Sequence, residues 1–259
     1  MKLAEKVAVV TGGASGIGRA LAHRFAAEGA AGVVVADLDK AGAEAVAREI
    51  GDAALPFACD VVDPDHADAL MDIAESAFGP VDLFCANAGV AVGEGLGETD
   101  DWDLALRVNL RAHVNAAERL LPSWLERKTG YFLATASAAG LVTQIGSAPY
   151  AVTKHAAVAF AEWLSITYGD RGLGVSCLCP MGVNTQLLHG SGRAGEVVKA
   201  SGAVLEPEDV AEIVIAGLET ETFLILPHPE VLDFYRRKGD DYDRWLTGMR
   251  RLQARVAAG

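Results

Sequence analysis

The chain has 259 residues, of which 51% are hydrophobic, and its formal net charge is −13. That length suits one large α/β domain with an extensive buried core. The acidic excess argues against a nucleic acid or an anionic membrane surface as a partner. No apolar run approaches the ~18 residues of a membrane span, so none is expected.

Short runs rich in β-branched residues alternate with longer helical patterns. Strands are predicted at residues 6–10, 32–36, 54–58, 81–86, 131–135, 174–178 and 222–226. Helices are predicted at residues 16–28, 40–50, 64–78, 101–127, 149–170 and 207–218. This order predicts a single-domain, doubly wound (Rossmann-like) α/β fold over residues 1–259, with a parallel seven-stranded sheet and helices on both faces.

Two segments interrupt the alternation. Residues 184–203 are rich in glycine and serine and follow the end of a predicted strand, which favours a substrate lid. Residues 229–259 are charge-rich and form a predicted helical extension. We expect this extension to pack on the domain or on a neighbouring subunit, and not to contact substrate.

The cysteines and histidines predict neither a metal site nor a disulfide. The four cysteines include no C-x-x-C pair, and Cys177 and Cys179 share one face of a strand. Buried, reduced thiols are therefore expected. The six histidines show no metal-ligand spacing. With no apolar leader in the N-terminal MKLAEKVAVV, a cytoplasmic location fits best.

A glycine-rich turn, Thr11-Gly12-Gly13-Ala14-Ser15-Gly16-Ile17-Gly18, directly follows the first strand and opens the first helix. The free N–H groups and the dipole of a helix N-terminus favour a phosphate at such a turn. Gly12 suits a tight turn, Gly16 lets the backbone approach a pyrophosphate, and Gly18 lets the helix pack closely on the sheet.

Asp37 follows the second strand, nineteen residues after Gly18. A carboxylate there accepts hydrogen bonds from the adenosine ribose and repels a 2′-phosphate. No basic residue follows it directly, since Lys40 is better explained as the start of a solvated helix. Ser15 also stands where a basic residue would hold that phosphate. The sequence therefore predicts NAD as the cofactor, over NADP.

Tyr150 and Lys154 lie four residues apart in a predicted helix and so share one face. A free tyrosine is a poor base near neutral pH, and a neighbouring positive charge lowers its pKa. Ser137, at the end of a predicted strand, could orient an alcohol or carbonyl against the phenol. The spacing alone is weak evidence, and it gains weight beside a nicotinamide site.

Together these motifs closely resemble the short-chain dehydrogenase/reductase family, in its branch of ~250 residues. The resemblance covers residue 6 to about residue 226. The family's motifs match the glycine turn, Asp60-Val61, Asn87-Ala88-Gly89, Asn109, Ser137, Tyr150 and Lys154. In the run Pro180-Met181-Gly182-Val183-Asn184-Thr185, methionine stands where the family usually has glycine.

The resemblance implies hydride transfer between nicotinamide and a carbinol carbon, with Tyr150 as general acid/base. Lys154 is then expected to hold the nicotinamide ribose and lower the pKa of Tyr150, and Ser137 to donate to the substrate oxygen. Asn109 is expected to interrupt its helix and hold a water linked to Lys154. The implied cofactor site comprises Gly12, Ser15, Gly16, Ile17, Gly18, Asp37, Leu38, Asp60, Val61, Asn87, Ala88, Gly89, Tyr150, Lys154, Pro180, Val183 and Thr185.

The substrate is expected to be a neutral, hydrophobic secondary alcohol or its ketone, because the candidate pocket lacks an arginine. Its candidate walls are Val90 to Val92, Ala138, Ala139, Leu141, Val142, Ile145, Met181, Leu187 and Leu188. The lid and tail could still supply Arg193, Lys199 or His189. Two alternatives stay open: an NADPH-dependent ketone reductase and a non-catalytic dinucleotide sensor.

The predicted helices at 101–127 and 149–170 carry more apolar residues than one sheet face requires. The family resemblance implies that they pair between subunits, which gives a homo-oligomer, either a dimer or a homotetramer.

Overall fold

A seven-stranded parallel sheet forms the centre of the protein, in the order β3-β2-β1-β4-β5-β6-β9. A computed structural model describes residues 1–258, with no side-chain description at 193, 199–201 and 256–258. The sheet confirms the predicted Rossmann-like α/β class. Its strands are β1 Val7–Thr11, β2 Gly32–Asp37, β3 Ala54–Ala58, β4 Leu83–Ala86, β5 Gly130–Thr135, β6 Leu173–Leu178 and β9 Leu224–Ile225.

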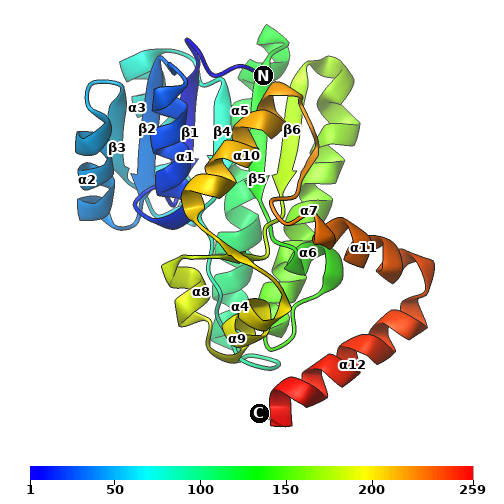
Figure 1. Ribbon diagram of the computed structural model, residues 1–259. Helices are drawn as coiled ribbons and strands as arrows, with labels where there is room; N and C mark the ends of the chain where they lie inside the picture. Colours follow the sequence, from blue (N-terminus) through cyan, green and yellow to red (C-terminus); the bar gives the residue numbers. More distant parts are fainter. Residues whose placement is uncertain (259) are drawn as a thin grey trace.

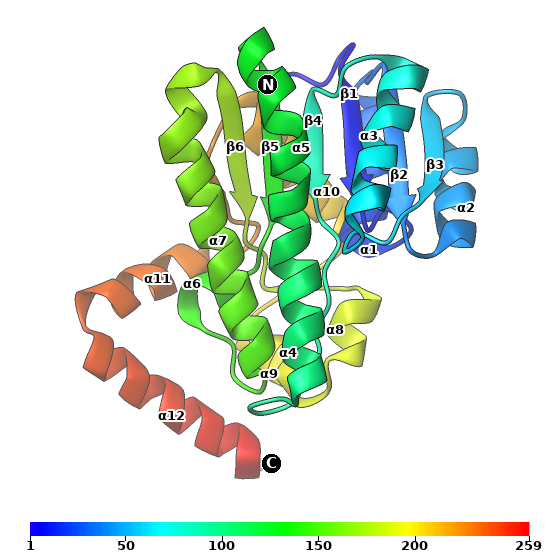
Figure 2. The ribbon, with the colours of Figure 1, turned by 180° about the vertical axis from the view of Figure 1, so that it is seen from behind.

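Helices cover both faces of this sheet (Figures 1 and 2). One face carries α3 Pro64–Phe78, α5 Ala112–Arg127 and α7 Ala148–Tyr168. The other carries α1 Gly16–Ala27, α2 Lys40–Ile50 and α10 Pro207–Glu219. The central strands β1, β4 and β5 are buried along their full length because helices cover both sides. The strand order reverses between β1 and β4, which opens a crevice at the carboxyl edge.

The helix predicted at 101–127 is divided. It consists of α4 Thr99–Leu106, a five-residue π-helical segment η1 Arg107–Arg111, and α5. A π-helical turn inserts one extra residue into the helix and often marks a functional site. Asn109 lies at the centre of η1, so the predicted helix interruption is present at that residue.

The segment at 184–203 is helical and not an irregular loop. It holds α8 Gln186–Gly190 and α9 Gly192–Ser201 between two short strands, β7 Gly182–Val183 and β8 Val204–Leu205, which pair in parallel. The polar residues that suggested a loop occur at helix ends: Thr185 Oγ1 caps α8 by accepting from the Leu188 N–H at 3.3 Å.

The C-terminal arm consists of α11 Glu230–Asp240 and α12 Tyr242–Ala258. Figures 1 and 2 show α12 standing away from the α/β body, to which α11 connects it. Lys238, on α11, is buried and donates to the carbonyl of Leu141 at 2.7 Å, in the short helix α6 Ala139–Val142. Nothing in residues 1–258 forms a helix with the length and apolar character needed to cross a membrane.

Candidate active site

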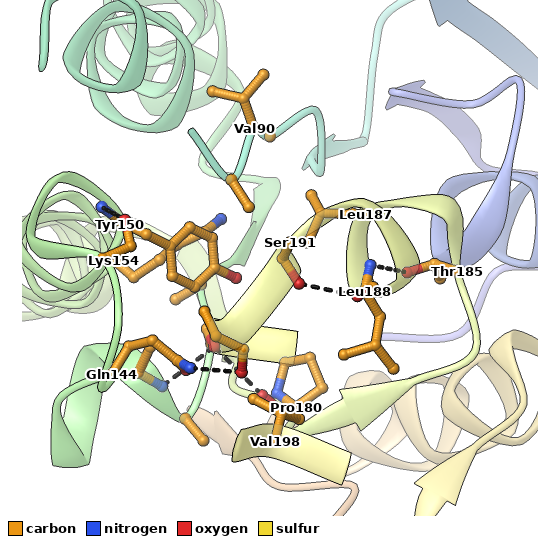
Figure 3. A pocket seen from close by; sticks show the side chains of 18 of the residues that line it. Val90, Gln144, Tyr150, Lys154, Pro180, Thr185, Leu187, Leu188, Ser191 and Val198 are labelled. Carbon is orange, nitrogen blue, oxygen red and sulfur yellow. Dashed lines mark hydrogen bonds between the residues drawn. The ribbon is translucent and has the colours of Figure 1, made fainter. Parts of the chain in front are cut away.

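A cavity of about 1340 Å³ opens at the carboxyl edge of the sheet (Figure 3). Gly12 and Asp37 line one end, and Ser137, Tyr150 and Lys154 line its middle. Every predicted cofactor-binding and catalytic residue lines this cavity except Gly18 and Asn109. The sequence thus identified one continuous site, although the role of each residue is not fixed by its place on the wall.

The glycine turn has the geometry that close approach of a ligand requires. Gly16 has φ of +52°, a left-handed conformation that favours glycine, and it lines the cavity. Gly18 faces inward instead, because a Cβ there would lie 2.0 Å from the carbonyl oxygen of Gly12. Gly18 therefore permits the packing of the turn and does not face the cavity.

Thr11 joins the ends of β1 and β4 beneath this turn. Its Oγ1 donates to the carbonyl of Cys85 at 3.0 Å and accepts from the N–H groups of Asn87 and Ala88. The Asn87 side chain donates back to the Thr11 carbonyl at 3.0 Å. Asn87 thus stabilises the floor of the crevice. Thr11 was placed in the glycine-rich turn, but the contacts of its hydroxyl with the end of β4 were not predicted.

Asp37 is held in place by two backbone donors at the end of β2. Its Oδ2 accepts from the Ala14 N–H at 2.9 Å, and its Oδ1 accepts from the Asp39 N–H at 2.9 Å. One carboxylate therefore connects the glycine turn to its own strand end. Its remaining lone pairs can accept hydrogen bonds from a ligand in the cavity. The neighbouring Leu38 side chain is 76% exposed and lines the same end.

Tyr150 and Lys154 project from α7 into the middle of the cavity, as Figure 3 shows. Lys154 Nζ lies 5.7 Å from the centre of the Tyr150 ring and donates to the carbonyl of Thr135 at 3.0 Å. Ser137, at the end of β5, accepts from the Ala139 N–H at 3.1 Å, which fixes its hydroxyl. Two elements, α7 and the end of β5, thus bring a phenol, an ammonium and a hydroxyl to one wall.

The expected lowering of the tyrosine pKa by Lys154 is not found among the protein groups. Burial raises the pKa of Tyr150, while the Ser137 hydroxyl opposes the rise and Cys179 adds to it. Burial also lowers the pKa of Lys154 to about 8, against a smaller opposing effect of Cys177 and Cys179. Desolvation is thus the largest influence on the pKa of both groups.

Asn109 is completely buried, and its amide is occupied by protein groups. Its Oδ1 accepts from the Val90 N–H at 2.8 Å, and its Nδ2 donates to the Val90 carbonyl and to Thr153 Oγ1. The side chain therefore fixes the loop that follows β4 against α7. Any water-holding role for this residue falls to its backbone within η1.

Met181, at the unusual position after β6, lines the cavity and is held by a histidine. Its N–H donates to His228 Nδ1 at 3.1 Å, and His228 Nε2 lies 3.1 Å from the carbonyl of Ala203. His228 is only 2% exposed. The side chain thus connects the loop after β6, the end of the segment 184–203 and the start of the arm.

Two features beside Lys154 are compatible with a bound dinucleotide. A Cβ on Gly89 would lie 3.3 Å from both Lys154 Nζ and Asn109 Oδ1, so glycine keeps space open above the ammonium. Thr135 also lines the cavity, and its Oγ1 is buried without a hydrogen-bond partner among the described residues. A buried unpartnered hydroxyl favours a bound polar group.

The substrate end differs from the expected pocket in three respects. Val92 and Leu141 are not among the lining residues, since the carbonyl of Val92 accepts from Ser147 and the Leu141 side chain belongs to the core. The arm contributes to the wall, which was not expected. The expected absence of an arginine is also wrong, because three arginines line the cavity: Arg107, Arg237 and Arg255.

The described side chains hold no cluster of three or more histidines, cysteines or acids that could bind a metal. All four cysteines are buried and free, as predicted. The side chains of Arg193 and Lys199 lie outside the described residues. His189, the remaining candidate in the lid, is within hydrogen-bonding distance of Asn184 Oδ1, at 2.8 Å, and does not line the cavity.

A Rossmann-like sheet with a glycine turn, an acid after β2 and a Ser–Tyr–Lys wall defines a class of dinucleotide-dependent oxidoreductases. The family model described as short chain dehydrogenase matches residues 6–194. The chain belongs to the short-chain dehydrogenase/reductase family, whose members act on alcohols and ketones with an NAD(P) dinucleotide.

Three known proteins illustrate the similarity. The 1-deoxy-11-beta-hydroxypentalenate dehydrogenase of Streptomyces exfoliatus is 36% identical, over 95% of this chain and 92% of its own. A family member from Burkholderia phymatum, solved in complex with NAD, superposes with a TM-score of 0.86 at 28% identity, over 94% and 96% of the two chains. A 3-ketoacyl-(acyl-carrier-protein) reductase from Brucella melitensis, complexed with NADH, gives a TM-score of 0.79 at 33% identity, over 86% and 96%.

Proposed function

We propose that this protein is an NAD-dependent oxidoreductase that interconverts a hydrophobic secondary alcohol and its ketone. The observation that carries this proposal is the meeting of Ser137, Tyr150 and Lys154 on the wall of the cavity that the glycine turn also lines. A non-catalytic dinucleotide sensor would not need an acid/base residue at that position.

Asp37 supports NAD as the preferred cofactor. Its carboxylate is fixed by Ala14 and Asp39, at the end of the cavity expected to hold the adenosine ribose. A 2′-phosphate would meet this fixed negative charge, with no lysine or arginine side chain described at that end of the wall. The two solved relatives with NAD and NADH agree with this preference.

Tyr150 is proposed to accept the proton of the substrate hydroxyl in oxidation and to return it in reduction. Ser137 donates a hydrogen bond to the substrate oxygen and so favours the charge that develops there. The bound nicotinamide supplies the hydride chemistry. Lys154 holds the adjoining ribose and passes protons outward past Asn109, whose backbone lies in the π-helical segment η1.

The wall around Tyr150 supports a hydrophobic substrate. Val90, Val142, Ile145, Leu187 and Leu188 line the cavity near the phenol. The expected neutrality of the substrate rested on the absence of an arginine, which the wall contradicts. The name of the Streptomyces relative describes a hydroxylated carboxylate, which is compatible with a hydrophobic alcohol that also carries a charge.

We further propose a homo-oligomer, a dimer or tetramer, formed by α7 and its neighbours. Trp163 and Ile166 on α7 are 52% and 86% exposed. Large apolar side chains exposed on one face of a helix often mark a contact with another subunit. Light scattering should therefore give a mass of at least twice the 27.0 kDa chain. The free, buried cysteines support a reducing, cytoplasmic location.

The proposed function is tested by NADH formation. The purified protein is mixed with NAD, and in parallel with NADP, and a panel of cyclic and steroidal secondary alcohols. We expect absorbance at the NADH band with at least one alcohol, and a kcat/KM at least tenfold higher with NAD. Equal or better efficiency with NADP would overturn the cofactor assignment and favour a ketone reductase.

A further inference from the structure

The C-terminal arm forms part of the cavity wall although α12 stands away from the body (Figure 1). Lys238 anchors the arm: its Nζ donates to the Leu141 carbonyl and lies 3.3 Å from His155 Nε2. His155 directly follows Lys154 in α7. The arm is thus attached to the two helices beside the catalytic wall, which places it over the substrate end.

The lining residues of the arm occupy one face of each helix. On α12, Trp245, Met249 and Leu252 follow a spacing of four and three residues, and Arg255 comes three residues later. On α11, Phe234 is followed after three residues by Arg237. Each arm helix therefore presents at least one apolar side chain and then an arginine to the same cavity.

The charge at this end of the cavity is opposite to that of the whole chain. Apart from the predicted cofactor-binding and catalytic residues, the charged side chains that line the cavity are three arginines, Arg107, Arg237 and Arg255, and one acid, Glu94. No ion pair joins these three arginines to a carboxylate within the described side chains. A chain of net charge −13 thus keeps three guanidinium groups, without an ion pair to a described carboxylate, on the wall of one cavity.

We infer that the substrate is an amphiphilic acid: an apolar body that carries the secondary alcohol, with a carboxylate held by one arginine of the arm, Arg237 or Arg255. This inference rests on the proposed oxidoreductase function and specifies its substrate. A guanidinium group binds a carboxylate through two parallel hydrogen bonds. Trp245, Met249 and Leu252 cover the apolar body between the anion and Tyr150.

The test compares acids with their own methyl esters. The probes are cis-4-hydroxycyclohexanecarboxylate and lithocholate, each with its ester, titrated by calorimetry into the full-length protein loaded with NADH. We expect at least one acid to bind about tenfold tighter than its ester. The double variant Arg237→Gln/Arg255→Gln should remove that difference. The matched control, Arg236→Gln/Arg251→Gln, changes two arm arginines outside the cavity wall and should preserve it.

The inference is overturned if both esters bind as tightly as their acids, if neither acid binds, or if the control variant loses the preference equally. NADH formation from the same probes with NAD is measured separately. Selective binding of an acid with no turnover would contradict the proposed function but would still support the anion site. Turnover of acid and ester with equal KM would support the function and overturn the site.

Discussion

The two ends of the cavity are built in different ways. The cofactor end is fixed by short links between neighbouring strand ends, such as Thr11 to Asn87 and Asp37 to Ala14. The substrate end is closed by α8, α9 and the arm, whose attachment depends on a buried lysine, Lys238, and on His228. In the proposed function, the sheet edge therefore provides the redox chemistry, and the segments added after β6 determine which alcohol is bound.

The largest effect is expected at the acid/base residue shared by both ends. Tyr150→Phe should lower kcat by about 10²–10⁴-fold, since a proton acceptor is lost, while NADH affinity changes little. Because burial raises the pKa of Tyr150, alcohol oxidation by the wild-type protein should also accelerate as pH rises into the alkaline range. Tyr131→Phe removes a buried phenol outside the cavity and serves as the control. Undiminished turnover in Tyr150→Phe would show that Tyr150 is not the general acid/base.

His113 is expected to make the stability of the folded protein depend on pH. It is buried on α5 with neither ring nitrogen partnered among the described residues, and burial, with Lys154 nearby, lowers its pKa from 6.5 to about 3. The unfolded chain then binds more protons between those values, so stability is present above pH 6.5 and is lost as pH falls toward 3. That difference corresponds to several kcal/mol.

His113→Leu should therefore flatten the fall in thermal midpoint between pH 7 and pH 4. His66→Leu, on the exposed part of α3, is the comparison variant. A pH profile of His113→Leu that matches the wild type would show that another group governs acid stability.

Asp37 tests whether the cofactor end sets the choice between NAD and NADP. Asp37→Ser should weaken NAD about tenfold, since charged hydrogen bonds are lost, and should narrow the gap to NADP by at least as much. The comparison variant is Asp52→Ser, which removes an exposed carboxylate outside the cavity. If the ratio of the kcat/KM values for NAD and NADP is unchanged, Asp37 does not contact the adenosine ribose.

Lys238 tests the attachment of the arm and has the smallest expected effect. Lys238→Met keeps the length of the stem but loses the donor to Leu141 and His155. We expect KM for the alcohol to rise several-fold, with KM for NAD unchanged. Arg236→Met, on the exposed side of the same helix, should change neither constant. Equal changes in both KM values would indicate a general loss of stability.

The fold and the cofactor end were predictable because their signals are local. The glycine turn, Asp37 and the Tyr150–Lys154 spacing each describe neighbouring positions on one element, and period and turn chemistry place those elements in a known order. The bounds of the sheet strands, and of the helices that cover the sheet, differ from the predicted bounds by only a few residues. The role of Thr11 was missed, since its hydroxyl acts across two strands.

The substrate end was less predictable because its contacts join distant parts of the chain. Lys238 meets Leu141 across 97 positions, and His228 meets Met181 across 47. Residue spacing in the sequence does not predict a buried lysine that donates to a distant backbone carbonyl. The same limit applies to the pKa of Tyr150, where the helical spacing suggested a lowering and burial of both side chains produced the opposite direction.

Isotope transfer tests the central claim most directly. The secondary alcohol that gives the fastest NADH formation is prepared with deuterium on its carbinol carbon and oxidised with unlabelled NAD. We expect the isolated NADH to carry the deuterium at C4 of the nicotinamide. Deuterium found in the solvent, with unlabelled NADH, would contradict hydride transfer as the reaction of this protein.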